Sequence, residues 1–221
     1  YYLIKQGYKV YGVEINDADG LAYIEGTDFF STMPLNELIL RIEPAPPEEV
    51  IEAANGLRYR DFLTVVLILD IEDVFDDNWV YIHSPDVKVG RIQNFKNWSS
   101  EMVPDDSTTS LGLEYFCNEG DSLWARKDSA LAELAAEELR AIGFANPEDV
   151  LTSIVIRMPK TYPAYFGSYE SFDQIRTYVD GFQNLFLIGR NGMHRYNNQD
   201  HSMLTAMIAV DNIVSGNLAK E

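Results

Sequence analysis

Residues 62–69 form an unbroken run of eight apolar or β-branched residues, and this run constrains the fold more than any other segment. A strand that is apolar on both faces must be covered on both faces, so it predicts a layered core. The other predicted strands mostly follow one another through turns: residues 1–4, 10–15, 21–24, 29–33, 79–83, 87–95, 111–117, 154–158 and 184–188.

Helices are predicted between some of these strands, but not in regular alternation with them. One is short and opens at Asn36 and Glu37, and another carries Glu48 and Glu49 in its first turn. A longer amphipathic helix has Asp128 as its cap and ends at Gly143. Two more are predicted at 172–179 and 202–214. The pattern predicts an α+β fold with a largely antiparallel or mixed sheet.

The chain changes character at residues 44–47, where Pro, Ala, Pro and Pro follow one another. This rigid segment is the best candidate for a domain boundary. At the other end, Tyr1 is not a methionine, and a strand is already under way. We therefore expect that the sequence begins inside a longer protein.

Charge and composition exclude several classes of partner. The chain has 17 Lys and Arg against 35 Asp and Glu, a net charge of −18, which argues against nucleic-acid binding. No apolar run approaches the length of about 20 residues that a membrane span needs. Cys117 is the single cysteine, so an internal disulfide is excluded and a reducing cytoplasmic location is expected.

Familiar catalytic patterns are missing from the sequence. Residues 7–12 have the glycine spacing of a phosphate loop, but Val13 stands where its lysine is required. The three histidines have no metal-ligand spacing, and the lone cysteine lies in an apolar strand. Acidic residues follow the strand at 62–69, where a solvated turn is favoured over a calcium site because the glycine and glutamate of a calcium loop are missing. Residues Glu133, Glu137 and Glu138 are expected on a solvated helix face. We predict no metal site, and no residue is identified as catalytic.

The most informative stretch follows the predicted strand at 184–188. Gly189, Arg190, Gly192 and Tyr196 crowd one strand-to-helix turn, and the next helix begins near Ser202. Free N–H groups and the positive dipole end at a helix N-terminus stabilise a phosphate or the electron-rich edge of a reduced flavin. The alternative is that Asp200 simply caps a core helix. The glycines and arginine in the same turn favour ligand contact.

At this point a family resemblance becomes specific. Gly189-Arg190-Asn191-Gly192, then Arg195-Tyr196 and Asp200, resembles the C-terminal flavin-binding segment of UDP-galactopyranose mutases and of the wider flavin amine oxidase and protoporphyrinogen oxidase superfamily. Residues 29–35 resemble the strand and turn by which those chains leave the FAD domain. The resemblance implies that residues 1–41 and 182–221 belong to an FAD-binding domain, that 42–181 form the substrate-binding domain, and that the N-terminal dinucleotide-binding segment is absent.

The resemblance also implies roles for individual residues. Cofactor contacts are expected from Gly189, Arg190, Asp200, His201, Ser202 and Met203. Substrate contacts are expected from Arg190 and Tyr196, and we add Arg91, Tyr81, Tyr162 and Tyr165 as candidates from the aromatic strands. Two positions depart from the mutases, which carry an acidic residue at Asn198 and a tyrosine at His194.

Three functions remain open at this stage. The favoured one is an FAD-dependent, amine oxidase-like oxidoreductase that removes a hydride from a small-molecule substrate. A mutase acting on a sugar nucleotide is the second, with Arg190 and Arg91 holding the diphosphate. The third is a non-catalytic domain that binds a partner through aromatic residues, although core packing is favoured over exposure for them: Trp98, Tyr115, Tyr162 and Phe166.

The expected absence of the dinucleotide-binding segment has two consequences. FAD belongs to the full-length protein, and the 221 residues alone should bind it weakly or not at all. The apolar faces of residues 1–41 and 182–221 should lack partners, which favours a homodimer through them.

Overall fold

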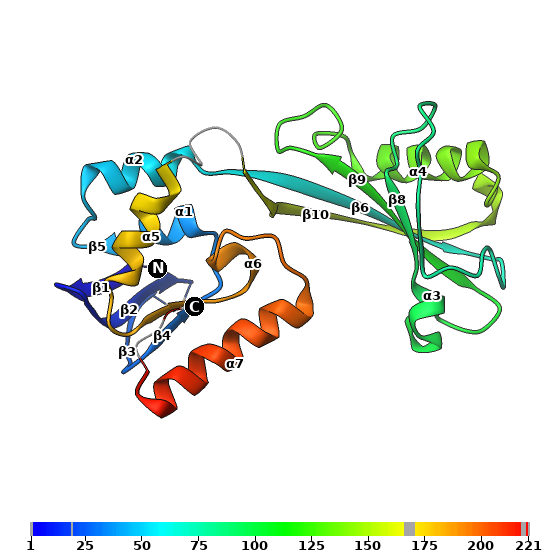
Figure 1. Ribbon diagram of the computed structural model, residues 1–221. Coiled ribbons are helices and arrows are strands. Elements are labelled where there is room, and N and C mark those ends of the chain that lie inside the picture. The colour runs from blue at the N-terminus through cyan, green and yellow to red at the C-terminus, as the bar shows by residue number, and fades with distance from the viewer. Residues whose placement is uncertain (1, 19, 166–170, 218–219, 221) are drawn as a thin grey trace. The chain divides into compact units, whose positions relative to one another are not determined.

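The computed structural model describes residues 2–18, 20–165, 171–217 and 220. The chain divides into two compact units, Tyr1–Tyr59 with Tyr162–Glu221 and Arg60–Thr161 (Figure 1). It passes from one to the other within two strands, β6 (Arg58–Leu69) and β10 (Val150–Ala164). Helices combine with antiparallel and mixed sheets, so the predicted α+β class is confirmed.

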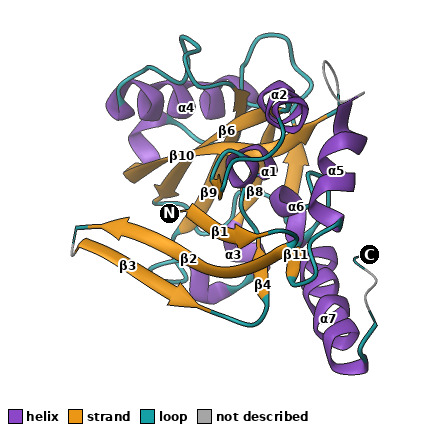
Figure 2. Cartoon of the chain, turned by 90° about the vertical axis from the view of Figure 1, so that its left-hand side faces the viewer, coloured by secondary structure: helices purple, strands orange, loops and turns teal. Residues whose placement is uncertain are grey.

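The first unit begins with the predicted meander, whose strands β1, β2 and β3 lie side by side (Figure 2). Strand β2 pairs antiparallel with both β1 and β3, and β5 adds to β1 in parallel, in the order β3-β2-β1-β5. Tyr1 and Phe166 lie outside the described residues. The elements of this unit are β1 (Tyr2–Gln6), β2 (Lys9–Asp17), β3 (Gly20–Glu25), β4 (Phe29–Ser31), α1 (Leu35–Ile39), β5 (Ile42–Glu43), α2 (Glu48–Gly56), α5 (Phe172–Asp180), β11 (Leu185–Leu187), α6 (Gly189–Gly192) and α7 (Gln199–Ser215).

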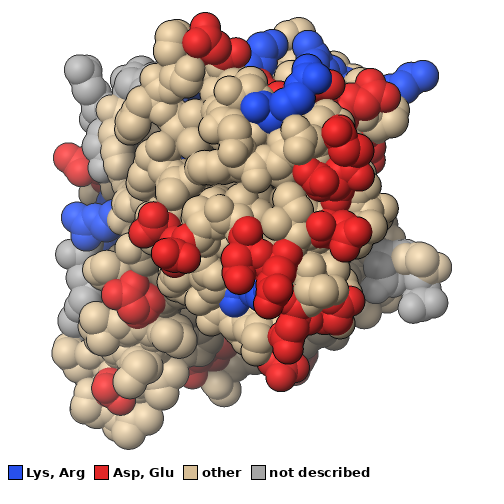
Figure 3. All heavy atoms as spheres, turned by 90° about the vertical axis from the view of Figure 1, so that its right-hand side faces the viewer, with Lys and Arg blue, Asp and Glu red and all other residues tan. Residues whose placement is uncertain are grey.

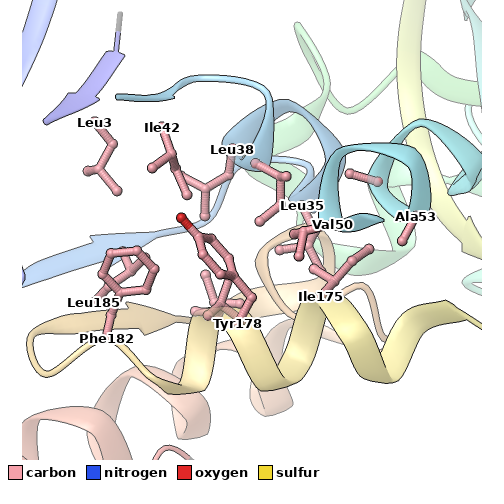
Figure 4. Close-up of a cluster of buried hydrophobic side chains, with 14 of the residues drawn as sticks. Leu3, Leu35, Leu38, Ile42, Val50, Ala53, Ile175, Tyr178, Phe182 and Leu185 are labelled. Carbon is pink, nitrogen blue, oxygen red and sulfur yellow. The ribbon is translucent and has the colours of Figure 1, made fainter. Parts of the chain in front are cut away.

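The core of the first unit joins segments from both ends of the chain (Figure 4). Leu38 and Ile42 pack with Ile175 and Tyr178 of α5, and the four are buried. Burial raises the pKa of the Tyr178 hydroxyl to about 12. Helices α2 and α5 therefore belong to the same packed body as the meander, because together they cover its apolar face.

A second, parallel sheet of the first unit holds the turn that the sequence singled out. Strands β4 and β11 pair in parallel, with Phe29 opposite Leu185 and Ser31 opposite Leu187. Asn184 fixes the start of β11, because its side chain bonds the Val10 N–H and carbonyl and the Thr27 carbonyl. The two strands end side by side, so the segments that follow them also begin side by side.

The second unit is a five-stranded sheet in the order β10-β6-β9-β8-β7 with helix α4 packed on one face (Figure 1). Leu63, Leu113 and Tyr115 project from the sheet into the core that Leu131 and Leu139 of α4 complete. The eight-residue run at 62–69 is thus a largely buried strand, as expected. The remaining elements are β7 (Trp79–Tyr81), β8 (Arg91–Asn94), α3 (Phe95–Trp98), η1 (Ser100–Met102), β9 (Thr109–Cys117), α4 (Asp128–Ile142) and η2 (Pro147–Asp149).

Helix α4 corrects two expectations. Its N-cap is Lys127, and Asp128 is the first helical residue, although Gly143 does end the helix in the left-handed conformation at φ 81°. Glu138 is buried, not solvated: its carboxylate accepts hydrogen bonds from the Lys88 N–H (2.7 Å), the Val89 N–H (3.0 Å) and the Tyr115 hydroxyl (3.0 Å). It therefore ties α4 to the segment before β8.

The compact units differ from the ranges predicted for the domains. The unit borders lie at 59/60 and 161/162, because α2 and α5 pack into the first core. The assignment of residues 42–181 to substrate binding and of 1–41 and 182–221 to FAD binding remains a prediction.

The surface carries the acidic charge that the composition implies. On the face in Figure 3, acidic side chains are widely spread, and most of the basic ones lie near the upper edge. Within the described residues, no helix combines the length and the hydropathy needed to cross a membrane.

Candidate functional site

Backbone hydrogen bonds define the tight turn after β11. The Ile188 N–H donates to the Ser31 carbonyl at the end of β4 (3.0 Å), and residues 189–192 then form the short helix α6. Gly189 has a left-handed φ of 72°, which glycine adopts without strain. Its N–H donates to the Thr205 hydroxyl of α7 (3.0 Å), so the turn is fastened to the helix that follows.

Gly192 lets α6 lie directly against β4. A Cβ at this position would be 2.3 Å from the Ser31 carbonyl oxygen, a backbone atom that cannot move aside. The glycines at 189 and 192 therefore serve different purposes: one permits the backbone angle, and the other permits close approach.

Arg190 lies against two tyrosine rings. Its Cζ is 5.0 Å from the ring centre of Tyr162 and 4.9 Å from that of Tyr196, and the two rings stack at 6.0 Å. Its Nε donates to the Asn197 carbonyl (2.8 Å), and the Tyr165 hydroxyl accepts the Tyr196 N–H. We call Arg190, Tyr162, Tyr165 and Tyr196 the tyrosine–arginine cluster.

Helix α7 begins at Gln199, three residues earlier than predicted. Asn198 is its N-cap but makes no side-chain capping bond, so its amide does not occupy the first-turn N–H groups. Asp200 is therefore not the cap: it lies in the first turn, its side chain is 74% exposed, and it pairs with His201 (3.1 Å). Ser202 donates to the Asn197 side chain (3.0 Å), and Met203 is exposed.

His194 is a buried titratable residue of this turn. Only 1% of it is exposed, and Tyr59, Tyr165 and Phe172 surround its imidazole. Burial lowers its pKa below the ordinary value, with a smaller opposing influence from the Ala164 carbonyl.

Arg91 and Tyr81 lie in the second unit and form their own cluster. Tyr81, Arg91 and Glu114 are opposite one another on β7, β8 and β9. The Arg91 side chain bonds the buried Glu114 carboxylate and lies 5.8 Å from the Tyr81 ring centre. Trp79 beside them is 45% exposed and Tyr81 is 55% exposed, so these aromatic rings face outward.

Two of the aromatic residues considered for partner binding, Trp98 and Tyr115, differ in burial. Trp98 of α3 is exposed and packs on Trp79 at 5.6 Å, contrary to the expectation of core packing, whereas Tyr115 is fully buried as expected. Burial raises the pKa of the Tyr115 hydroxyl.

Cys117 and the acidic segment after β6 show packing, not ligand geometry. Burial raises the pKa of the Cys117 thiol, which makes it a poor nucleophile. The Lys96 ammonium donates to the carbonyls of Glu72 and Asp106, both at 2.7 Å, so a lysine occupies the centre of this acidic segment. Within the described ranges, no group of acidic, histidine or cysteine residues has metal-site geometry.

The structure thus brings together Gly189, Arg190, Tyr162, Tyr165 and Tyr196, with Ser202 close by through Asn197. Sequence analysis did not assign Asn197 or Thr205 to the site. Both residues act through local hydrogen bonds. Only the position of Thr205, three residues after Ser202 on the same helix face, could have indicated its role. Glu114 was missed because its partner, Arg91, is 23 residues away in the sequence.

Comparison with known proteins identifies the fold. No protein-family model and no curated protein matches the sequence. A solved structure of reduced UDP-galactopyranose mutase is similar over 100% of this chain and 46% of its own, with a TM-score of 0.76 and 21% identity. Wild-type putrescine oxidase bound to putrescine matches over 97% and 47%, with a TM-score of 0.65 and 12% identity. An oxidoreductase from Methanosarcina mazei matches over 95% and 48%, with a TM-score of 0.63 and 13% identity.

These likenesses confirm the predicted resemblance at the level of the fold. The chain spans about half the length of the structures it matches. It has the fold of one part of UDP-galactopyranose mutase and of putrescine oxidase, with the turn at 189–197 inside the matched region.

Proposed function

We propose that this chain supplies the substrate-binding domain and the flavin-contacting segment of an FAD-dependent oxidoreductase. The observation that carries the proposal is the turn between β11 and α7, where Gly189, Arg190 and an uncapped helix start meet in a fold shared with putrescine oxidase. The chemistry that bound FAD supplies is the acceptance of a hydride.

The residues present fit a flavin. Gly189 brings backbone close to the helix start without a side chain, and no side-chain cap occupies the first turn of α7. Backbone N–H groups and a positive helix end suit the pyrimidine edge of a flavin, which gains negative charge on reduction. Gly189, Arg190, Ser202 and the first turn with Asp200, His201 and Met203 would hold it.

The tyrosine–arginine cluster is proposed to bind the substrate. The bond from Arg190 Nε to Asn197 fixes the direction of the guanidinium, and the rings of Tyr162 and Tyr196 limit its rotation. A guanidinium held in this way can orient a carboxylate or phosphate. Arg91 and Tyr81 are weaker candidates, because the buried Glu114 carboxylate already compensates the charge of Arg91.

A sugar-nucleotide mutase is the second candidate, and one comparison favours it. The UDP-galactopyranose mutase structure matches the whole chain with a TM-score of 0.76, against 0.65 for putrescine oxidase. In this alternative, Arg190 would bind the diphosphate of the nucleotide.

The experiment is to express the complete protein that contains this chain and to record its flavin absorption spectrum after purification. Stoichiometric FAD, present at isolation or after reconstitution, is expected. A colourless protein that cannot be reconstituted would remove both enzymatic candidates.

A titration of the reduced, FAD-loaded protein with a UDP-sugar separates the two chemistries. Absence of saturable binding excludes the mutase. Saturable binding would instead exclude a simple amine oxidase-like reaction if Arg190→Ala weakens it by about tenfold or more and Arg195→Ala does not. A tenfold loss of affinity corresponds to one charged hydrogen bond. Arg195 is the matched control, since it is exposed in the same turn.

A homodimer remains part of the proposal. Met203, Met207, Val210 and Val214 form an exposed apolar stripe on α7. Apolar surface of this kind is typical of a region that packs on another polypeptide.

A further inference from the structure

His194 occupies a strained position in the candidate site. It follows α6 with a φ of 49°, a left-handed angle that costs a non-glycine residue about 1–2 kcal/mol. Its N–H donates to the Asn191 carbonyl (3.3 Å), and it is almost completely buried. The surrounding packing must therefore hold this conformation in place.

Three rings from separate segments enclose the imidazole. Tyr59 of β6 meets it at 4.9 Å and 89°, Tyr165 at 6.4 Å and 87°, and Phe172 of α5 at 5.8 Å and 35°. Two of these contacts are edge-to-face, an arrangement that uncharged aromatic rings favour. One side chain thus joins the turn to β6, to the end of β10 and to α5.

A continuous chain of contacts joins His194 to Arg190. Tyr165, which contacts His194, also accepts the Tyr196 N–H through its hydroxyl. Tyr196 in turn stacks on Tyr162, and both rings lie within 5.0 Å of the Arg190 Cζ. A displacement of His194 would therefore reach Arg190 through Tyr165 and Tyr196.

The groups around His194 disfavour a charge there. The packed elements present the Tyr59 and Tyr165 phenols, the Phe172 ring and the Ala164 carbonyl, and the carbonyl favours the protonated form. Its own segment carries Arg190 and Arg195, whose charges have the same sign as an imidazolium. Burial acts in the same direction and outweighs the carbonyl.

We propose that His194 is a positioning residue that makes the tyrosine–arginine cluster sensitive to pH: uncharged, it keeps Tyr165 on the Tyr196 amide, and on protonation it leaves the ring enclosure and releases that bond. If the cluster binds the substrate as proposed, the substrate site is ordered at neutral pH and loosened in acid. Only this consequence rests on the proposed function.

The test is amide hydrogen exchange at Tyr196, measured at about pH 7.5 and about pH 5, on either side of the ordinary histidine pKa near 6.5. After correction for the intrinsic rate, the protection of this amide should fall by about tenfold in acid, because the released hydrogen bond contributes about 1–1.5 kcal/mol. His194→Phe keeps a ring at this position but cannot titrate. In this variant, the protection of the Tyr196 amide should be independent of pH. His201→Gln is the control, because it removes an exposed histidine of the same turn and should behave like the unaltered chain.

Equal protection of Tyr196 at both pH values in the unaltered chain would overturn the inference, and so would an unchanged acid response in His194→Phe. If His194→Phe fails to fold, NMR titration of the His194 ring in the unaltered chain decides. A ring that titrates below pH 6.5 together with the Tyr196 amide supports the proposal, and one that titrates at or above 6.5 contradicts it. No ligand is present in either measurement, so the result is independent of whether FAD or substrate binds.

Discussion

At Gly192, the candidate turn packs directly against the backbone of β4. Its missing Cβ would lie 2.3 Å from the Ser31 carbonyl oxygen, so Gly192→Ala must separate α6 from β4. We expect this substitution to lower the free energy of unfolding by about 1–3 kcal/mol, the usual cost of overpacking. Urea denaturation measures the change.

Gly26→Ala is the matched control for Gly192→Ala. A Cβ there would meet only the outer end of the Phe29 ring, at 3.1 Å, and a side chain can adjust where a backbone cannot. Equal losses of stability for the two variants would contradict the close-approach argument.

His194 also makes stability depend on pH. Because burial lowers its pKa in the folded state, the unfolded chain binds the proton more readily. Its contribution to stability is therefore fully present above about pH 6.5 and is lost as the pH falls from 6.5 through the lowered folded-state value. Urea denaturation from neutral to mildly acidic pH should show this loss, and His194→Phe should reduce it. An identical pH profile in the variant would show that other groups are responsible.

At the scale of elements, Glu138 fastens α4 to the second unit. Its carboxylate accepts three hydrogen bonds, two from backbone N–H groups and one from Tyr115. Glu138→Ala leaves these donors buried, and we expect a loss of about 3 kcal/mol or more in the free energy of unfolding. Tyr115→Phe removes one bond to a charged group and should cost about 1.5–3 kcal/mol.

Glu137→Gln tests whether burial causes the effect at Glu138. Glu137 is the preceding residue on α4, half exposed, and pairs with Arg140 on the surface. Its replacement should change stability by less than about 1 kcal/mol. A comparable loss for Glu137→Gln and Glu138→Ala would mean that helix propensity or net charge is responsible.

Local sequence signals predicted most elements but not their ends. Turn residues and alternating apolar runs located the meander, and Pro47 with Glu48 located α2. The start of α7 was predicted at Ser202 because the apolar stripe becomes visible there, whereas the helix begins at Gln199 beside polar residues that carry no stripe. Strand β10 is far longer than residues 154–158, because exposed residues conceal the alternation of a half-solvated strand.

The candidate site was predictable only in part. Gly189, Arg190 and Tyr196 lie in one contiguous motif, so the sequence could place them together. The contacts of Tyr162 with Arg190 and of Tyr59 with His194 join segments distant in the chain, and no local pattern specifies such contacts. Glu138 was misplaced for a similar reason: its donors come from the segment before β8 and from β9.

At the scale of the whole molecule, the exposed face of α7 bears on assembly. Met207 is 63% exposed and Val214 is 82% exposed on one stripe of the helix. We expect the chain to associate with increasing concentration, and Met207→Lys combined with Val214→Lys to suppress this, because a buried lysine at an interface is costly. Sedimentation equilibrium measures the mass.

Leu151→Lys is the control for the α7 variant, since it adds a charge at an exposed apolar residue of β10 in the second unit. It should associate as the unaltered chain does. A mass of one chain at every concentration in the unaltered protein would contradict the homodimer.

The proposed function depends most on whether the turn from Ile188 to Ser202 faces a flavin. Hydrogen exchange in the complete protein, with FAD bound and after FAD has been removed, tests this most directly. We predict that FAD slows exchange at the amides of residues 199–201, the first turn of α7, and leaves the amides within α4 unchanged. Bound FAD that leaves residues 199–201 unaffected would contradict it.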